Sequence, residues 1–203
     1  MKFDQLVHVA GNLPFFDLPA LTQASGEPKK HLLTQLSQWK KSNKITQLRR
    51  GLYSLSDPYR KASLSPLHLA NELYRPSYLS GIWALAYYGL IPEKVIPFTS
   101  VTTRVTRTFQ NSLGLFTYSS LKKDFFWGMV SQKMKNIPVW IAEPEKGLLD
   151  YFHLNSGEWT TDRIKEMRFQ NLEEINFEKL TTYVKQWGSA RLMRTILRLK
   201  DFL

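Results

Sequence analysis

Apolar residues in the first third of the chain recur at helical spacing. They lie three or four positions apart over Leu18–Ala24 and again over Leu32–Trp39, which predicts two helices. The Ser25-Gly26 pair between them predicts a tight turn, because glycine readily adopts the backbone conformation that ends a helix. A shorter apolar pattern over Met1–Val9 predicts a further helix that packs against these two.

The residues that follow have the composition of two short strands. Ile45–Leu48 and Leu52–Leu55 are rich in apolar and β-branched residues. Arg49, Arg50 and Gly51 lie between them, and glycine supplies the turn conformation that other residues resist. The pattern therefore predicts a two-stranded hairpin with two arginines at its tip.

The second predicted helix has an apolar side and a polar side without an acid. Its apolar side consists of Leu32, Leu33, Leu36 and Trp39. The opposite side carries lysine, histidine, threonine and glutamine; threonine and glutamine hydrogen-bond to base edges, while lysine reaches guanine or phosphate. Two helices joined by a tight turn and followed by a hairpin are typical of a winged helix-turn-helix domain. The alternative is a solvated basic helix in an ordinary helical hairpin.

The polar side and the hairpin supply the candidate DNA-binding residues. They are Lys29, Lys30, His31, Thr34, Gln35, Ser37, Gln38, Lys41, Lys44, Thr46, Arg49 and Arg50. The residues expected to face the major groove are Lys30, Thr34, Gln38 and Lys41. Lys44 and the two hairpin arginines are expected to hold phosphates or enter the minor groove.

Beyond a polar segment marked by Pro58, the pattern predicts a second domain. Helices are expected over residues 65–74, 78–89, 143–154, 160–169, 177–187 and 191–199. Between Lys94 and Trp140 the apolar residues follow a period of two, which predicts a mostly antiparallel sheet. The sequence thus predicts an α+β protein: a winged helix-turn-helix domain over residues 1–58, and helices packed on a mostly antiparallel sheet over 59–203.

Composition favours a folded protein with a polyanionic partner. The chain has 203 residues, 43% of them hydrophobic, and a formal net charge of +11. From Pro28 to Ser56 there are seven Lys and Arg and no Asp or Glu, so this charge is not neutralised locally. The chain has no cysteine, and its longest apolar stretch is shorter than the roughly 20 residues of a membrane span. The apolar run in residues 1–16 is short and interrupted, so we expect no signal peptide. We expect a cytoplasmic protein that does not enter membranes.

Motifs for catalysis, cofactors and metals are missing from the sequence. The four histidines are scattered, and no phosphate-binding or nucleophile motif occurs. Glu143, Glu145 and Asp150 follow a strand and surround Lys146, so the enzyme alternative is a metal-dependent nuclease. The spacing argues against it, because Pro144 occupies the position where such a site needs an acid. Acids at a helix start and a Lys146–Asp150 pair four residues apart explain the cluster. We expect no enzyme activity, cofactor or metal.

Basic residues outside the first domain form three further groups. They are Arg104 with Arg107, Lys122 with Lys123, and Arg191, Arg194, Arg198 and Lys200 in the last helix. Each group would widen a nucleic-acid footprint or meet an acidic partner. The alternative for each is solvated surface charge.

Three motifs occur in a fixed order along the chain. They are RRGLYSL (Arg49–Leu55), PSYLSGIWALAYYGLIPE (Pro76–Glu93) and IAEPEKGLLDYF (Ile141–Phe152). In order and separation they resemble the AbiEi family of antitoxins from type IV toxin–antitoxin systems, and the resemblance spans nearly the whole chain. The recognition helix would then be Pro28–Lys41 and the wing tip Arg49–Gly51. Family members are often arginine-rich there, whereas this helix offers lysine, threonine and glutamine.

The resemblance implies a function as well as a fold. It implies a winged-helix domain joined to an α/β antitoxin domain, binding to inverted repeats in double-stranded DNA, and repression of the protein's own operon. It also implies antagonism of a nucleotidyltransferase-like toxin and a role in phage abortive infection. An inverted repeat implies two copies of the chain on the DNA. The alternative is a protein-interaction module without specific DNA binding.

Overall fold

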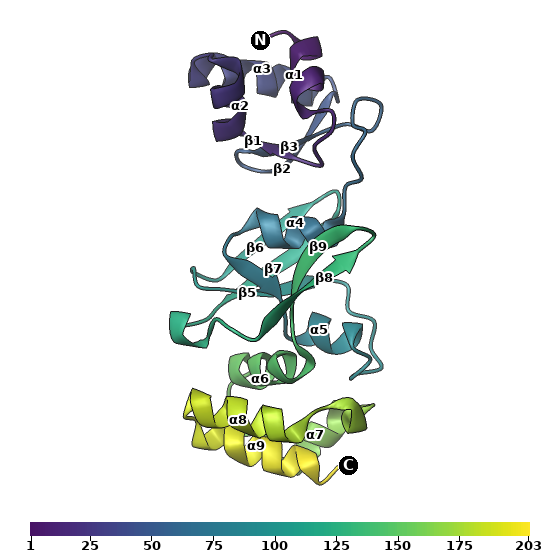
Figure 1. Ribbon diagram of the computed structural model, residues 1–203, viewed down its shortest axis with the longest axis vertical. Coiled ribbons are helices and arrows are strands. Elements are labelled where there is room, and N and C mark those ends of the chain that lie inside the picture. The colour runs from purple at the N-terminus through teal and green to yellow at the C-terminus, as the bar shows by residue number, and fades with distance from the viewer. The chain divides into compact units, whose positions relative to one another are not determined.

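The computed structural model describes all 203 residues and has an α+β architecture, which confirms the predicted class (Figure 1). The chain divides into two compact units. The first comprises Met1–Leu69 together with Gln110–Leu113, and the second comprises Ala70–Phe109 and Gly114–Leu203. The boundary expected after residue 58 falls inside the first unit. No helix is long and apolar enough to cross a membrane.

The first unit contains three helices and a small antiparallel sheet. Its elements are α1 (Phe3–Ala10), β1 (Phe16–Asp17), α2 (Leu18–Ser25), α3 (Lys29–Lys41), β2 (Ile45–Arg49) and β3 (Leu52–Leu55). The strand order is β1-β3-β2, so β3 is the central strand. The two-residue strand β1 was not predicted, because so short a segment has no measurable periodicity of its own.

Local signals explain where α2 begins and ends. The Asp17 carboxylate accepts a hydrogen bond of 2.8 Å from the backbone N–H of Ala20, which satisfies one free donor of the first turn. Gly26 ends the helix with a φ of 66°. Both features agree with the predicted turn between the two helices.

The buried side of α3 is narrower than the sequence predicts. Leu32, Leu36 and Trp39 pack in the core of the first unit, with 9% exposure or less. Leu33, expected on the same side, is 44% exposed, and that expectation is wrong. One residue turns a helix by about 100°, so Leu33 lies beyond the arc of the buried positions.

The second unit contains a six-stranded sheet and the remaining helices. Its strands are β4 (Ser77–Leu79), β5 (Phe98–Thr102), β6 (Arg107–Asn111), β7 (Gly114–Ser120), β8 (Met129–Met134) and β9 (Ile137–Ala142). Its helices are α5 (Ile82–Tyr87), η1 (Lys123–Phe125), α6 (Pro144–Leu154), α7 (Thr161–Glu166), η2 (Leu172–Glu174), α8 (Phe177–Trp187) and α9 (Ala190–Lys200). The helix α4 (Pro66–Leu73) spans the boundary between the units, as does β6, whose last two residues belong to the first unit.

The sheet is mixed rather than mostly antiparallel. Its order is β6-β7-β5-β4-β9-β8. The β4–β5 and β8–β9 pairs are antiparallel, whereas β4–β9 and β5–β7 are parallel. A period of two identifies strands but carries no information on the direction of their neighbours, and the parallel neighbours β4 and β9 are far apart in sequence.

Strand β4 lies where the first turn of a helix was predicted. The apolar run from Tyr78 to Gly89 was expected to be helical throughout, but Ser77–Leu79 is extended and the helix begins at Ile82. Tyr78 and Leu79 are fully buried. A segment that is buried on every side shows no polar face, so apolar spacing does not separate strand from helix.

Helix α6 is central to the second unit. Figure 1 shows it between the sheet and the layer formed by α7, α8 and α9. Leu148, Leu149 and Phe152 from α6 are fully buried in a core that continues into α8 and α9. A helix covered on two sides needs apolar groups around most of its circumference, as the sequence of α6 provides.

Candidate nucleic-acid interface

The outward side of α3 carries most of the predicted DNA-binding residues. Its exposed polar side chains are Lys29, Lys30, His31, Thr34, Ser37, Gln38 and Lys41. Gln35 is half-buried, and its Oε1 atom is buried without a hydrogen-bond partner. The Thr34 hydroxyl donates to the Lys30 carbonyl at 3.2 Å, which fixes the direction of its methyl group. The helix therefore presents amide, hydroxyl and ammonium groups to solvent.

The positive charge of this surface has no counter-charge. The side chains of Lys29, Lys30, Lys41 and Arg50 make no hydrogen bond or ion pair. The first unit has four acids; Asp4 lies in the first turn of α1, and the other three bind groups outside this surface. Asp17 caps α2, Glu27 pairs with the amino group of Met1, and Asp57 pairs with Arg60. Exposed cations without partners raise the local positive potential and attract polyanions.

A side-chain hydrogen bond joins α3 to the hairpin. The Lys40 ammonium donates to Gln47 Oε1 at 2.8 Å. The hairpin itself is β2 and β3 in antiparallel register, with an irregularity between Gln47 and Arg49. The helix and the hairpin are therefore linked within one unit, by this contact as well as by the shared core.

The two hairpin arginines have different environments. Arg50 is exposed at the turn, whereas Arg49 belongs to β2 and is half-buried. One guanidinium nitrogen of Arg49 donates to the Arg50 carbonyl at 2.9 Å. Lys44 lies with its ammonium 4.6 Å from the centre of the Phe3 ring, and Thr46 is half-buried. Among Lys44, Arg49 and Arg50, Arg50 is therefore the one whose side chain is exposed and makes no hydrogen bond or ion pair.

A buried polar network lies in the second unit, around the predicted Lys146–Asp150 pair. The pair forms and is fully buried, so the i,i+4 prediction is confirmed. Tyr78 donates to Asp150 Oδ2 at 3.0 Å and Ser80 donates to the same oxygen at 2.6 Å. The Lys146 ammonium also donates to the Tyr78 hydroxyl at 2.8 Å. The sequence identified the pair but not Tyr78 and Ser80, which lie about seventy positions away.

Aromatic rings enclose the Lys146 ammonium. The centres of the Trp187, Trp127 and Tyr78 rings lie 4.9, 5.2 and 5.4 Å from its Nζ atom. Burial lowers the pKa of Lys146, while the neighbouring Asp150 opposes that shift. Burial also raises the pKa of Tyr78, and Asp150 adds to that effect. The network joins α6, β4, α8 and the loop before β8, as a structural centre of the second unit.

The acids of the predicted cluster divide between two sites. Glu143 accepts from Tyr183 at 2.5 Å, and Glu143 and Glu145 both lie 3.2 Å from the Lys179 ammonium. Asp150 faces the buried network instead. No group of three or more histidines and acids lies where it could hold a metal ion. The cluster therefore offers no convergent set of carboxylates for metal-assisted hydrolysis.

A cavity of about 350 Å³ lies beside Tyr78 in the second unit. Its lining includes Asn71, Glu72, Arg75, Phe126, Met129 and Trp140. The polar members are already paired: Asn71 exchanges two hydrogen bonds with the Trp140 backbone, and Glu72 pairs with Arg75. The polar groups of the cavity are thus occupied by the protein itself.

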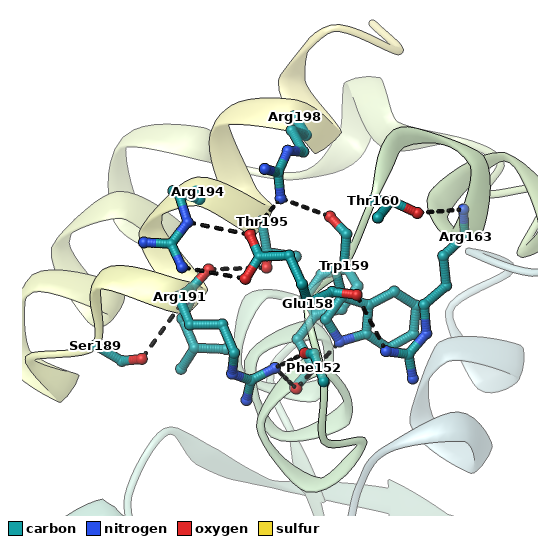
Figure 2. Close-up of polar contacts among 12 residues, drawn as sticks. Phe152, Glu158, Trp159, Thr160, Arg163, Ser189, Arg191, Arg194, Thr195 and Arg198 are labelled. Carbon is teal, nitrogen blue, oxygen red and sulfur yellow. Dashed lines mark hydrogen bonds and ion pairs between the residues drawn. The ribbon is translucent and has the colours of Figure 1, made fainter.

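Three arginines of α9 bind to groups within the second unit (Figure 2). Arg194 and Arg198 hold the Glu158 carboxylate at 3.0 and 2.6 Å, and these hydrogen bonds lower the pKa of Glu158 to about 2. Arg191 points the other way and donates to the carbonyls of Phe152 and Gly157, each at 3.0 Å. These arginines stabilise the packing of α9 and are not free cations.

Comparison with known proteins adds no assignment: no family model matches the chain, and no curated protein matches it.

Proposed function

We propose that this protein is a DNA-binding transcriptional repressor that also serves as the antitoxin of a type IV toxin–antitoxin system. In this proposal the first unit acts as a winged helix-turn-helix domain in the cytoplasm. Helix α3 is the recognition helix and the β2–β3 hairpin is the wing. Two copies bind the half-sites of an inverted repeat, and the second unit counteracts a nucleotidyltransferase-like toxin.

The observation that carries the proposal is the outward side of α3. Thr34 and Gln38 are exposed rather than packed in the core, and they alternate with lysines that have no counter-charge. Base edges in the major groove need such donors and acceptors, and phosphates need such cations. An ordinary solvated helix would be expected to carry acids among its lysines, and this one carries none.

The antitoxin part rests on the resemblance to the AbiEi family. Its third motif, IAEPEKGLLDYF, contains Lys146 and Asp150, and its second contains Tyr78 and Ser80. These four residues form the buried network of the second unit. The motifs therefore specify contacts that build the domain, as motifs that mark a common fold would do.

DNA binding is tested by measuring affinity for duplexes from the region upstream of the gene at several salt concentrations. If about five phosphates are neutralised per subunit, log affinity falls with log salt at a slope near −4.5. A double Arg49→Ala and Arg50→Ala variant should weaken binding to all duplexes about equally, whereas Gln38→Ala should change which sequence is preferred. Lys165→Ala with Lys185→Ala serves as the control, because both lysines are exposed and unpaired. A slope near zero contradicts the proposal.

Antitoxin activity is tested by co-expression with the product of the neighbouring reading frame. We expect the intact chain to restore growth, and the Arg49→Ala, Arg50→Ala variant to lose repression while it still restores growth. Neutralisation without any DNA binding by the intact chain would favour the alternative, a protein-interaction module. The stoichiometry on an operator duplex tests for two copies.

A further inference from the structure

The cations of the second unit fall into two groups with different surroundings. From Glu143 to the end of the chain, ten Lys and Arg are balanced by ten Asp and Glu. From Lys94 to Ala142, a segment that contains strands β5 to β9, the only acid is Asp124. The cations of that segment are Lys94, Arg104, Arg107, Lys122, Lys123, Lys133 and Lys135. The sheet segment is therefore strongly cationic, whereas the helical layer is neutral.

Two arginines of this segment rest on one aromatic platform formed by Tyr74, Phe109 and Tyr118. The three ring centres lie 5.4 to 5.8 Å from one another. The Arg104 guanidinium lies 4.3 Å from the centre of the Tyr74 ring, and that of Arg107 lies 5.5 Å from the centre of the Phe109 ring. Guanidinium groups stacked on rings lose rotational freedom while their N–H edges stay available to a ligand.

Two lysines, Lys122 and Lys123, follow a strand that ends at the same end of the sheet as the strand that leads to Arg104. Strands β5 and β7 are parallel, so their final residues, Thr102 and Ser120, are register partners. The chain from β5 leads directly to Arg104, and the chain from β7 leads to Lys122 and Lys123. A hydrogen bond of 3.1 Å from the Ser120 N–H to the Thr106 hydroxyl brings the two segments together. We call Arg104, Arg107, Lys122 and Lys123 the basic cluster.

No carboxylate forms an ion pair with the basic cluster, although Asp124 directly follows Lys123 in the sequence. The four side chains form no ion pair, and the hydrogen bond of Arg104 is a long contact of 3.5 Å to the Arg75 carbonyl. All four are exposed, as are the hydroxyl-bearing residues Thr106 and Ser120. Fixed guanidinium forks, flexible ammonium groups and hydroxyls are the groups that contact phosphates in nucleic-acid complexes.

We propose that the basic cluster binds successive phosphates of a nucleic-acid backbone, without regard to base sequence. The inference does not rest on the function of α3, because every residue of the cluster belongs to the second unit. An acidic protein partner is the less suitable occupant. A protein interface needs an apolar centre, and Val105 is the one large apolar side chain that is exposed between β5 and β6.

The experiment measures binding of the full-length chain to a 30-base-pair duplex of random sequence by fluorescence anisotropy over a salt series. The cluster variant combines Arg104→Ala, Arg107→Ala, Lys122→Ala and Lys123→Ala. The control variant combines Lys133→Ala, Lys165→Ala, Lys185→Ala and Lys200→Ala, which removes the same charge from exposed lysines without partners. Urea unfolding checks that both variants are folded.

We expect the slope of log affinity against log salt to become shallower by about 3 to 4 in the cluster variant, from the loss of about four phosphate contacts. The control variant should keep the slope of the natural chain. Equal slopes in the two variants would overturn the proposal. It would also be overturned if the cluster variant bound the duplex normally but no longer bound poly-glutamate, because the cluster would then serve an acidic protein.

Two further variants separate geometry from charge and this site from α3. Arg104→Lys with Arg107→Lys keeps the charge but removes the planar fork, so we expect severalfold weaker binding with the slope unchanged; undiminished binding would contradict the role of the platform. In a chain that carries Lys30→Ala, Arg49→Ala and Arg50→Ala, we expect residual duplex binding that the cluster substitutions abolish. If the cluster substitutions did not abolish this residual binding, the proposal for the basic cluster would be overturned, whereas the proposal for α3 would still stand.

Discussion

The Lys146 ammonium lies 2.8 Å from the hydroxyl oxygen of Tyr78, to which it donates a hydrogen bond inside the fully buried network of the second unit. The two residues are sixty-eight positions apart. Tyr78 in turn donates to Asp150, the ion-pair partner of Lys146, so each charged group has several polar partners. A buried ion pair persists only when such partners compensate for its lost hydration.

Removal of the Lys146 charge should strongly destabilise the protein. In Lys146→Met the Asp150 carboxylate remains buried without its cation, so we expect the free energy of unfolding to fall by about 3 to 5 kcal/mol. Urea denaturation at pH 7 measures the loss. The double variant Lys146→Met, Asp150→Asn should be more stable than Lys146→Met alone, because no isolated charge remains. A double variant that is less stable than the single variant would contradict this explanation.

Gly128 should tolerate a methyl group less well than Gly188 does. Both glycines have a φ of 70°, so alanine is strained by a similar amount at each position. A Cβ at Gly128 would lie 2.9 Å from the Lys146 Cγ, whereas a Cβ at Gly188 would have no neighbouring atom within 4 Å. We expect Gly188→Ala to lower the free energy of unfolding by about 1 kcal/mol and Gly128→Ala by clearly more. Equal losses in thermal or urea unfolding would show that Lys146 moves aside without cost.

Leu32 and Leu33 are neighbours on α3 with opposite roles. Leu32 is fully buried, so Leu32→Ala should lower the free energy of unfolding by about 2 to 5 kcal/mol. Leu33 is 44% exposed, so Leu33→Ala should change it by less than about 1 kcal/mol. Instead we expect Leu33→Ala to alter binding to thymine-containing operators, since an apolar side chain contacts the thymine methyl group. A large loss of stability in Leu33→Ala would contradict the exposed position.

The Glu158 contacts should make stability dependent on pH in acid. Hydrogen bonds from Arg194 and Arg198 lower the pKa of Glu158 from 4.5 to about 2 in the folded state. A lowered pKa stabilises the fold above the unfolded-state value, and this contribution is lost as pH falls from about 4.5 to about 2. The melting temperature of Glu158→Gln should therefore lie below that of the natural chain at pH 7, and the two should converge by pH 2.

Glu166→Gln provides the control for that experiment. Glu166 is exposed and its side chain has no partner, so its substitution should leave the pH dependence unchanged. A constant difference between Glu158→Gln and the natural chain from pH 7 to pH 2 would mean that the arginines stabilise the fold by packing rather than through charge.

The accuracy of the sequence predictions differed between helices with clear signals at their ends and segments without such signals. Helix α8 begins and ends at the predicted residues, Phe177 and Trp187, and α6 agrees within a residue at its start. Each has signals at its ends, such as Asn176, whose side chain caps α8, and the proline that opens α6. The segment after Ser77 has no polar face, and there apolar spacing failed to distinguish strand from helix.

The candidate interface was largely visible in the sequence because it depends on local order. The positions of Lys30, Thr34 and Gln38 on one side of a helix follow from the helical repeat alone. The environment of Arg49 does not, because its burial in β2 depends on how the hairpin packs on the rest of the unit. Leu33 differs from Arg49, because the helical repeat itself places Leu33 beyond the arc of the buried positions.

The sequence by itself determined the α+β class, the outward positions of the α3 polar residues and the Lys146–Asp150 pair, since each follows from spacing within one element. Only the tertiary structure decided the mixed sheet, the enclosure of Lys146 by Tyr78, Trp127 and Trp187, and the aromatic platform beneath Arg104 and Arg107. These features join residues from distant elements. Their proximity depends on the packing of the whole core, to which no short stretch of sequence is sensitive.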